Sequence, residues 1–457
     1  ANETVNLPTG GGNLITTTGA TFTGNIATAG ISAVTAGTSN FVAGVNAGNS
    51  IVSGGNYNTV VGDEAGTAIT TADDCTAVGK SALQANTTGF AQTAVGSGAL
   101  ATSTGSENTA VGYQALNNSV GATSNTAVGY RSLDTNTTAD NNTSVGHLAM
   151  YANTTGASNV ALGQGALRNN TTGTYDTASG YRALFNNTTG SYNAAFGRLS
   201  LEANTTGNEN TAIGNAALYL NTTGINNTAT GSASLGANTT GSYNTSVGQS
   251  ALPVSTTGQY NVANGYESLK ANTTGNGNTG IGRQSGDTTT SGNYNIFVGP
   301  STRGAGTTND QEIVIGTQGG GNVVGKGANT GYMQPNGGHM YQGNNASAWS
   351  QTSDERLKKN IVNNDVGLAK INAIQVRNFD YKTAEEVESD GVLDSSQAIT
   401  KTGTQLGVIA QELELICPDC VTTESTGVKT VSGDNLHWHM LNAIKELSAR
   451  IEVLEGE

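Results

Sequence analysis

The sequence predicts a mainly β protein: a homotrimeric, parallel β-solenoid built from 17-residue repeats, followed by a small α+β domain that ends in a coiled-coil helix. Sixteen glycines, from Gly62 to Gly316, are spaced by 17 residues, with one interval of 16. The units between them lack a 3.6-residue periodicity, whereas their Thr-Ala-Val-Gly segments suit short strands. Short self-similar units stack into a solenoid, because each coil buries its apolar face only against its neighbours.

The rod is expected over residues 51–320, and residues 1–50 are expected to form a β-rich entry to it. Each coil offers only about four apolar side chains, mostly Ala, Val and Leu, so a rod made of one chain would have a thin core. Three identical chains around one axis would give these side chains a common interior, and closed cyclic symmetry is usual for homo-oligomers. We therefore expect a homotrimer.

Two polar or aromatic patterns follow the repeat. Asn-Thr-Thr is formally an N-glycosylation acceptor, but Asn and Thr also bond nearby backbone groups, so we interpret these residues as ladders between stacked coils. Six tyrosines lie five residues before a repeat glycine; they form a row that either binds sugars or, as we favour, only stabilises the rod. The asparagines are Asn86, Asn136, Asn153, Asn170, Asn187, Asn204, Asn221, Asn238 and Asn272, and the tyrosines are Tyr57, Tyr175, Tyr192, Tyr243, Tyr260 and Tyr294.

Residues 321–352 depart from the repeat and concentrate aromatic side chains. We assign them to a distal tip or to a collar that joins the rod to the next domain. Exposed aromatic residues at the end of a fibre are plausible receptor contacts, so the candidates are Tyr332, Tyr341 and Trp349. A packed collar is equally compatible with this composition.

Composition excludes several classes of partner. The net charge is −14, which disfavours electrostatic binding to nucleic acid or to an anionic membrane surface. No apolar stretch approaches the roughly 20 residues that span a bilayer, so membrane insertion is not expected. The repeats contain no P-loop, dinucleotide fingerprint or serine-hydrolase elbow, and no cofactor is expected.

Charge density rises sharply at Ser353. Residues 1–352 carry 24 charged residues, whereas residues 353–457 carry 28 in 105 positions, and the repeat is absent there. A break of this kind marks a domain junction, so residues 353–457 are assigned to a separate domain. In this domain we expect helices at 365–374 and 410–416, strands at 376–381 and 405–409, and a last helix from Asp434 onward.

The last helix carries apolar residues spaced 4, 3, 4 and 3 apart, which is a heptad seam. A trimeric coiled coil here would tie three C-termini together and set the register of the rod. A packed amphipathic helix is the alternative, and we favour the coiled coil. The seam residues are Met440, Ile444, Leu447, Ile451 and Leu454.

Cys417-Pro418-Asp419-Cys420 has a spacing found in redox and zinc motifs, and His437 and His439 follow it. We interpret the two cysteines as small core side chains instead, and no metal is expected. The chain has only three cysteines, which cannot form a disulfide framework.

Three blocks resemble the intramolecular chaperone of bacteriophage endosialidases and tail spikes. The resemblance covers nearly the whole of residues 353–457 and implies a domain that helps a trimeric β-structured fibre to fold and, in many members, then cuts itself off. The blocks are Thr352-Ser353-Asp354-Glu355-Arg356-Leu357-Lys358-Lys359-Asn360-Ile361, Leu406-Gly407-Val408-Ile409-Ala410-Gln411-Glu412 and Asn442-Ala443-Ile444-Lys445-Glu446-Leu447.

The resemblance implies that Ser353 and Lys358 are catalytic and that the Ser353–Asp354 bond is cut. A serine needs a base to become a nucleophile, and a lysine amine can serve only where burial or neighbouring cations favour its neutral form. The positive charge of Arg356 would favour the neutral form of Lys358. The negative charges of Glu355 and Asp354 would oppose it unless these side chains point elsewhere. The competing interpretation is that Ser353 only caps a short charged helix.

Ring size constrains the reaction. The Ser353 hydroxyl cannot readily attack its own carbonyl, because the ring would have four members. Either Ser353 of a neighbouring chain attacks, or the hydroxyl attacks the carbonyl of Thr352 through a five-membered intermediate. Both routes favour assembly before cutting. A chaperone is needed because nearly identical coils can slip by one repeat at little cost, and clamping the C-termini sets the register.

The predicted function is a homotrimeric phage tail fibre or appendage, made in the host cytoplasm, carried on the virion and used for attachment. The partners expected are a host cell-surface receptor, with a glycan as one candidate, and other virion tail proteins. Residues 12–25 loosely resemble phage shaft segments, and the repeats loosely resemble the head coils of trimeric autotransporter adhesins. A bacterial surface adhesin is therefore one alternative. A glycan-cleaving tail spike is another, although Glu107, Glu202, Glu209 and Glu267 form no convincing catalytic pair.

Overall fold

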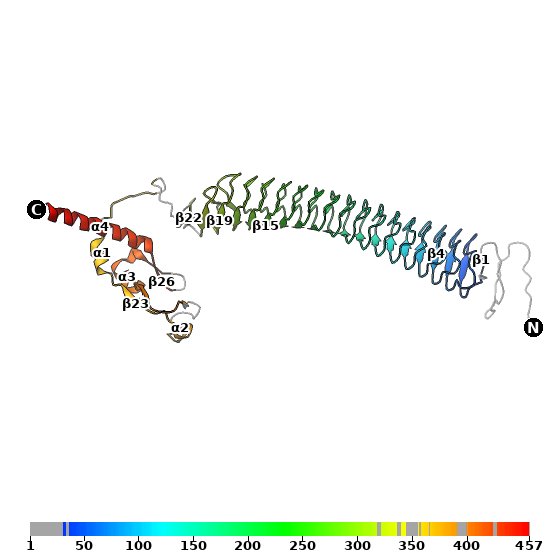
Figure 1. Ribbon diagram of the computed structural model, residues 1–457, viewed down its shortest axis with the longest axis horizontal. Coiled ribbons are helices and arrows are strands. Elements are labelled where there is room, and N and C mark those ends of the chain that lie inside the picture. Colours follow the sequence, from blue (N-terminus) through cyan, green and yellow to red (C-terminus); the bar gives the residue numbers. More distant parts are fainter. Residues whose placement is uncertain are drawn as a thin grey trace, which may run out of the picture. The chain divides into compact units, whose positions relative to one another are not determined.

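The computed structural model describes residues 31–32, 36–317, 321–335, 340–343, 355, 358–364, 366–390, 399, 401–423 and 427–456. The chain divides into two compact units, Ala1–Thr352 and Ser353–Glu457. The first unit is a β-solenoid of about 17 turns, and the second is a small domain that carries the helices. The prediction of a mainly β chain with a repeat solenoid and a small C-terminal domain is therefore confirmed (Figure 1).

Each coil of the solenoid contributes one short strand to a single long sheet. The strands are β1 (Ile31–Ser32), β2 (Phe41–Ala43), β3 (Thr59–Val61), β4 (Thr76–Val78), β5 (Thr93–Val95), β6 (Thr109–Val111), β7 (Thr126–Val128), β8 (Thr143–Val145), β9 (Val160–Leu162), β10 (Thr177–Ser179), β11 (Ala194–Phe196), β12 (Thr211–Ile213), β13 (Thr228–Thr230), β14 (Thr245–Val247), β15 (Val262–Asn264), β16 (Thr279–Ile281), β17 (Ile296–Val298), β19 (Ile313–Gly316), β21 (Gly331–Gln334) and β22 (Met340–Gln342). Strands β18 (Thr302–Arg303) and β20 (Val323–Val324) form a separate parallel pair.

The register is one repeat per coil. From β2 to β21 the long sheet is parallel, and equivalent residues lie side by side, as Thr126 does with Thr143. The two ends differ, because β1 pairs with β2 and β22 pairs with β21 in antiparallel fashion. The parallel stack therefore stops at an antiparallel pair at each end of the described rod.

The repeat glycine allows the coils to approach closely. Gly197 follows β11 with a φ of +130°, a region that residues with a side chain rarely adopt. A Cβ atom on Gly197 would lie 2.5 Å from the carbonyl oxygen of Gly214 in the next coil. The 17-residue spacing of glycine thus follows from a backbone contact that recurs in every turn.

The apolar interior is closed within one chain. In the long sheet from β3 to β19 the central residue of each strand, usually alanine, is buried, and from Gly79 to Gly265 so is a leucine or methionine four residues after the repeat glycine. These leucines turn the chain inward with positive φ, as Leu201 does at +50°. The expectation that the small apolar residues need three chains to form an interior is therefore wrong, and this argument for a trimer does not hold. The stacked residues include Leu83, Leu100, Leu116, Leu133, Met150, Leu167, Leu184, Leu201, Leu218 and Leu235.

Asparagine ladders complete the interior. The Asn187 amide donates to Asn170 Oδ1 at 3.0 Å and to the carbonyl of Gly190 at 2.8 Å. In a second ladder, the backbone N–H of Asn210 donates to Asn193 Oδ1 at 3.1 Å. The asparagines of the Asn-Thr-Thr turns are fully buried, so the folded protein cannot present them for glycosylation, and the predicted ladders are confirmed.

The C-terminal unit contains short helices, two antiparallel strand pairs and one long helix. Its elements are α1 (Leu368–Ala373), β23 (Arg377–Phe379), α2 (Ala384–Asp390), β24 (Gln405–Gly407), α3 (Ala410–Ile416), the 3-10 turn η3 (Pro418–Cys420), β25 (Val421–Thr423), β26 (Lys429–Val431) and α4 (Gly433–Glu455). β23 pairs with β24 and β25 pairs with β26, both antiparallel. All five predicted elements are found, whereas α2, β25 and β26 had not been predicted.

Helix α4 organises this unit. It begins after Ser432, whose hydroxyl accepts the N–H of Asn435 at 3.4 Å. Glu446 on α4 accepts the N–H groups of Gly367 and Leu368 at 2.7 and 3.1 Å, which caps α1 and joins the two helices. None of the helices in the described ranges is long and apolar enough to cross a membrane.

Candidate functional site

The predicted cleavage segment is described only in part. Ser353, Asp354 and Arg356 lie outside the described residues, so their geometry stays a prediction. Glu355 and Lys358 are described and exposed, and the N–H of Lys358 donates to the carbonyl of Glu355 at 2.9 Å.

The aromatic residues after the rod are partly buried. Tyr332 extends the parallel stack through its pairing with Val314, is 4% exposed, and donates its hydroxyl to Gln334 Oε1 at 3.0 Å. Tyr341 packs against the same core. Both side chains therefore behave as parts of a packed collar in this chain, and their predicted role as exposed receptor contacts is not supported. Trp349 lies outside the described residues.

Two aromatic ladders run along the rod. Tyr175 and Tyr192 stack with ring centroids 5.1 Å apart, and Tyr243 and Tyr260 stack at 5.0 Å, which agrees with the predicted row. A second ladder, which had not been predicted, stacks Tyr113, Tyr130 and His147 with centroid distances of 5.4 and 5.2 Å. His147 thus continues the row of tyrosine rings as its last member.

A hollow of about 350 Å³ lies at the end of this second ladder. It forms around Gly165, a position where the coils on either side carry Leu148 and Arg182. Its walls also include Arg168 and Phe185, and the guanidinium carbons of Arg168 and Arg182 lie 5.4 and 4.2 Å from the Phe185 ring centroid. Because Gly165 has no side chain, a hollow lined by cationic and aromatic side chains opens at this position.

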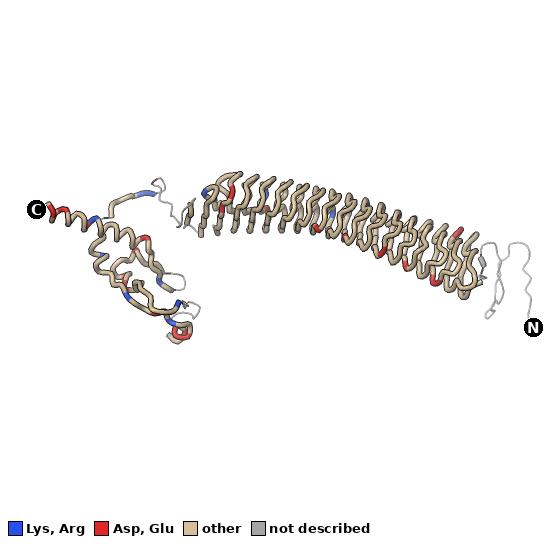
Figure 2. Tube along the Cα trace, in the orientation of Figure 1, with Lys and Arg blue, Asp and Glu red and all other residues tan. Residues whose placement is uncertain are grey.

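The charge of this hollow stands out on an acidic chain. A terminal amino group of Arg182 pairs with the buried Glu202 at 2.6 Å, and Nε of both Arg168 and Arg182 has no hydrogen-bond partner within the described residues. Arg198, in the next coil, lies 6.0 Å from the Tyr181 ring. Charged residues are otherwise sparse along the solenoid (Figure 2). The signal in the sequence was three arginines in consecutive repeats, which had not been singled out.

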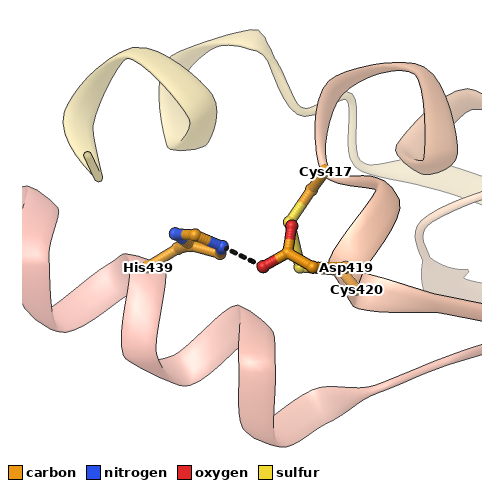
Figure 3. Close-up of side chains that lie close together, drawn as sticks. All are labelled: Cys417, Asp419, Cys420 and His439. Atoms are coloured by element: carbon orange, nitrogen blue, oxygen red, sulfur yellow. Dashed lines mark hydrogen bonds and ion pairs between the residues drawn. A yellow bond between two sulfur atoms is a disulfide. The ribbon is translucent and has the colours of Figure 1, made fainter. Parts of the chain in front are cut away.

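A second group of reactive side chains lies in the C-terminal unit, where Cys417, Asp419 and Cys420 face His439 of α4 (Figure 3). Both cysteines are fully buried beside Leu413, as expected for core side chains, but they are joined in a disulfide, which had not been expected. His439 Nε2 lies 2.8 Å from Asp419 Oδ2. This hydrogen bond, with a smaller contribution from Lys370, lowers the pKa of Asp419 below its usual value.

A rod of stacked repeats followed by a separate small domain is the architecture of a fibrous β-solenoid protein with a C-terminal accessory domain. Residues 353–422 match the family model Peptidase_S74, described as chaperone of endosialidase. This match confirms the resemblance noted in the sequence blocks, and it begins at the first residue of the second compact unit. It ends before α4, so it is shorter than the resemblance suggested.

Neither the curated proteins nor the solved structures compared with this chain contain a match. The family match and the β-solenoid together fit a phage tail fibre with an endosialidase-type chaperone.

Proposed function

We propose that this chain is a structural protein of a phage tail fibre or spike, and that its C-terminal unit is an intramolecular chaperone that drives the assembly of three chains. The observation that carries the proposal is the position of the family match. It begins at Ser353, where the repeat unit has ended and the second compact unit starts. A folding domain appended directly to a repetitive rod addresses the main hazard of such a rod, which is pairing in a shifted register.

The exposed seam of α4 supports association through this unit. The five heptad residues are between 44% and 72% exposed in the single chain: Met440, Ile444, Leu447, Ile451 and Leu454. The side of α4 that packs within the chain uses His439 and Ala443 instead. Apolar residues repeated every 3.5 positions and left uncovered are what a coiled coil of three α4 helices would bury.

Self-cleavage belongs to the same proposal. The hydroxyl of Ser353 from a neighbouring chain attacks the carbonyl carbon of the Ser353–Asp354 bond, the new amino group of Asp354 leaves, and water then hydrolyses the ester. Lys358 accepts the hydroxyl proton and returns it to the leaving amine. Lys358 is exposed in the single chain, and we propose that contacts with other chains shield it in the trimer. Cleavage would therefore report that assembly is complete.

The test is denaturing electrophoresis and intact mass of the expressed full chain beside Ser353→Ala. The proposal expects a fragment of about 104 residues, Asp354–Glu457, only from the wild type. If the wild type and the Ser353→Ala variant both remain full length after assembly, the result contradicts self-cleavage. Sedimentation of the Ser353→Ala protein tests the chaperone part separately, because a monomer at micromolar concentration contradicts chaperone-driven trimerisation.

Attachment to the host surface is proposed to use the rod. The hollow around Gly165 combines Arg168 and Arg182 with the Phe185 ring, and this combination suits a saccharide that carries a carboxylate. An anionic glycan of the host surface is therefore the receptor class that fits this chain best, and the protein would act on the virion after synthesis in the host cytoplasm. Its partners there would be other tail proteins.

The glycan-cleaving alternative is weakened by the low pKa of one candidate acidic residue and by the ion pair that another one forms. A general acid needs a raised pKa, whereas Gln284, Lys270 and Tyr266 hold the pKa of Glu267 at about 2. Glu202 is engaged by Arg182. A bacterial adhesin with the same rod remains a second candidate, and detection of the protein in purified phage particles would distinguish the two.

A further inference from the structure

We propose that the reduced form of the C-terminal unit binds one Zn²⁺ ion through Cys417 Sγ, Cys420 Sγ, His439 Nε2 and a carboxylate oxygen of Asp419. These four ligand atoms already lie within 4.8 Å of one another (Figure 3). A tetrahedral zinc site has ligand atoms about 3.3–3.8 Å apart, given its bond lengths. Formation of the site therefore needs movements of only about 1 Å and the opening of the disulfide.

The local fold brings the ligands together from two elements. Pro418 starts η3, and this turn places Cys417, Asp419 and Cys420 on one side of the chain. The fourth ligand comes from α4, where His439 is 3% exposed. His437 is exposed on the same helix, so only one of the two histidines near the Cys-Pro-Asp-Cys motif is in a position to bind.

The orientation of His439 supports a role as a ligand. Its Nδ1 lies 3.1 Å from the carbonyl oxygen of Val366, which can only accept a hydrogen bond. This contact favours a proton on Nδ1 when zinc is bound, and it directs Nε2 toward Asp419 and the cysteines. Histidines that bind metals are typically held in this way by a backbone carbonyl or a carboxylate.

The charges of the group also suit a divalent cation. Two thiolates and one carboxylate carry three negative charges, and Zn²⁺ neutralises two of them. The ammonium group of Lys370 lies 3.3 Å from Asp419 Oδ1 and 3.3 Å from His439 Nε2, and it would offset the third after moving toward the carboxylate. The cysteines are fully buried, whereas the side chain of Asp419 is 50% exposed and gives the ion a path from solvent.

Zinc and the disulfide exclude each other. Two equivalents of a small thiol reduce the Cys417–Cys420 bond: each protein sulfur gains one electron and one proton, and the small thiols leave as their own disulfide. Zinc binding then releases the two thiol protons. In a reducing compartment the ion would tie η3 to α4, the helix with the exposed seam, and in an oxidising one the disulfide would replace it.

The experiment uses the full chain, reduced with a phosphine and freed of metal, and titrated with Zn²⁺ against a chromogenic chelator. We expect one ion per reduced chain, no tight binding by the oxidised chain, and thiolate charge-transfer absorption when Co²⁺ replaces Zn²⁺. Asp419→Asn, whose side chain is half-exposed, should fold and bind about 10-fold or more weakly. His439→Gln should lose tight binding, whereas His437→Gln and Cys75→Ser serve as matched controls and should bind as the wild type does.

A reduced wild-type chain that binds no more zinc than the oxidised chain would overturn the proposal. The same holds if His437→Gln and His439→Gln change the affinity equally, since the two histidines lie on one helix and differ mainly in burial. Because the readout is metal bound per chain, it does not depend on cleavage or on trimer formation. Failure here is therefore distinguishable from failure of the proposed function.

Discussion

Asp176 occupies a rung of the second asparagine ladder, and its Oδ1 accepts the backbone N–H of Asn193 in the next coil at 2.8 Å. The rungs on either side are Asn159 and Asn193. Burial raises the pKa of Asp176 to about 7, although hydrogen bonds from Asn193 and Asn187 oppose this shift. One carboxyl group in the middle of the rod therefore titrates near neutral pH.

Asp176→Asn is expected to stabilise the rod at high pH. The folded pKa, about 7, lies above the ordinary value of 3.8, so folding favours the protonated acid. The wild-type rod therefore has its full stability below about pH 4 and loses stability as the pH rises to about 7, by about 4 kcal/mol for a shift of about 3 units. Asparagine removes this loss, so the unfolding midpoint of the variant should exceed that of the wild type at pH 8 and approach it at pH 4.

The matched control is Asn227→Asp, which puts a carboxyl group on another rung of the same ladder. It should introduce a similar loss of stability at pH 8. A difference between Asp176→Asn and the wild type that is the same at both pH values would contradict the assignment of the effect to this carboxyl group.

The exposed heptad seam of α4 predicts that a polar substitution within it weakens the trimer. Ile451→Asn places an amide in the proposed coiled coil, and we expect the trimer to dissociate at concentrations at least tenfold higher than the wild type requires. Val453 is 64% exposed but lies off the seam, so Val453→Asn should remain trimeric. Analytical ultracentrifugation over a concentration series measures both variants. Equal behaviour of the two would argue against the seam as the interface.

The role of Lys358 can be separated from general positive charge. Lys358→Ala should slow self-cleavage by about 10²–10⁴-fold, the usual contribution of a general base. Lys359→Ala removes the neighbouring ammonium group and should cleave at a rate within about tenfold of the wild type. The fraction of intact chain is followed over time by mass spectrometry. Cleavage of Lys358→Ala at the wild-type rate would remove this lysine from the mechanism.

The hollow at Gly165 predicts selective loss of glycan binding. Arg168→Ala should weaken binding of a carboxylate-bearing saccharide by about 10–100-fold, because hydrogen bonds to charged groups contribute about 1.5–3 kcal/mol. Arg283, several coils away, provides the control, since Arg283→Ala makes the same change of net charge. Binding to an array of neutral and acidic saccharides measures both. A loss shared equally by the two variants would indicate a non-specific charge effect.

The architecture of the rod was predictable because one residue type, glycine, marks the same position in every repeat. Gly197 and its equivalents cannot carry a side chain, so glycine recurs at every turn and reveals the repeat. The closed interior was not predictable by counting apolar residues. Asn170, Asn187 and their equivalents fill part of the interior with amide groups that satisfy one another, so the core is larger than the aliphatic side chains alone suggest.

The candidate sites were likewise predictable only in part. Neighbouring sequence motifs pointed to the family that residues 353–422 match, because those motifs are local. The selection of His439 over His437 depends on how α4 packs against η3 and on the carbonyl of Val366, which is 73 residues away in the sequence. Contacts of that range are set by tertiary packing, which a single sequence does not display. The hollow at Gly165 was missed for the same reason, since it needs three consecutive coils in register.

The antiparallel pairs at the two ends, β1 with β2 and β21 with β22, have a consequence for solubility. A stack of parallel strands that ended bluntly would offer unpaired backbone groups on which another copy could continue, as strands do in amyloid growth. A reversed strand at each terminus occupies those groups and breaks the pattern that a second copy would extend. Particles of defined length, rather than filaments growing end to end, are the expected outcome of this arrangement.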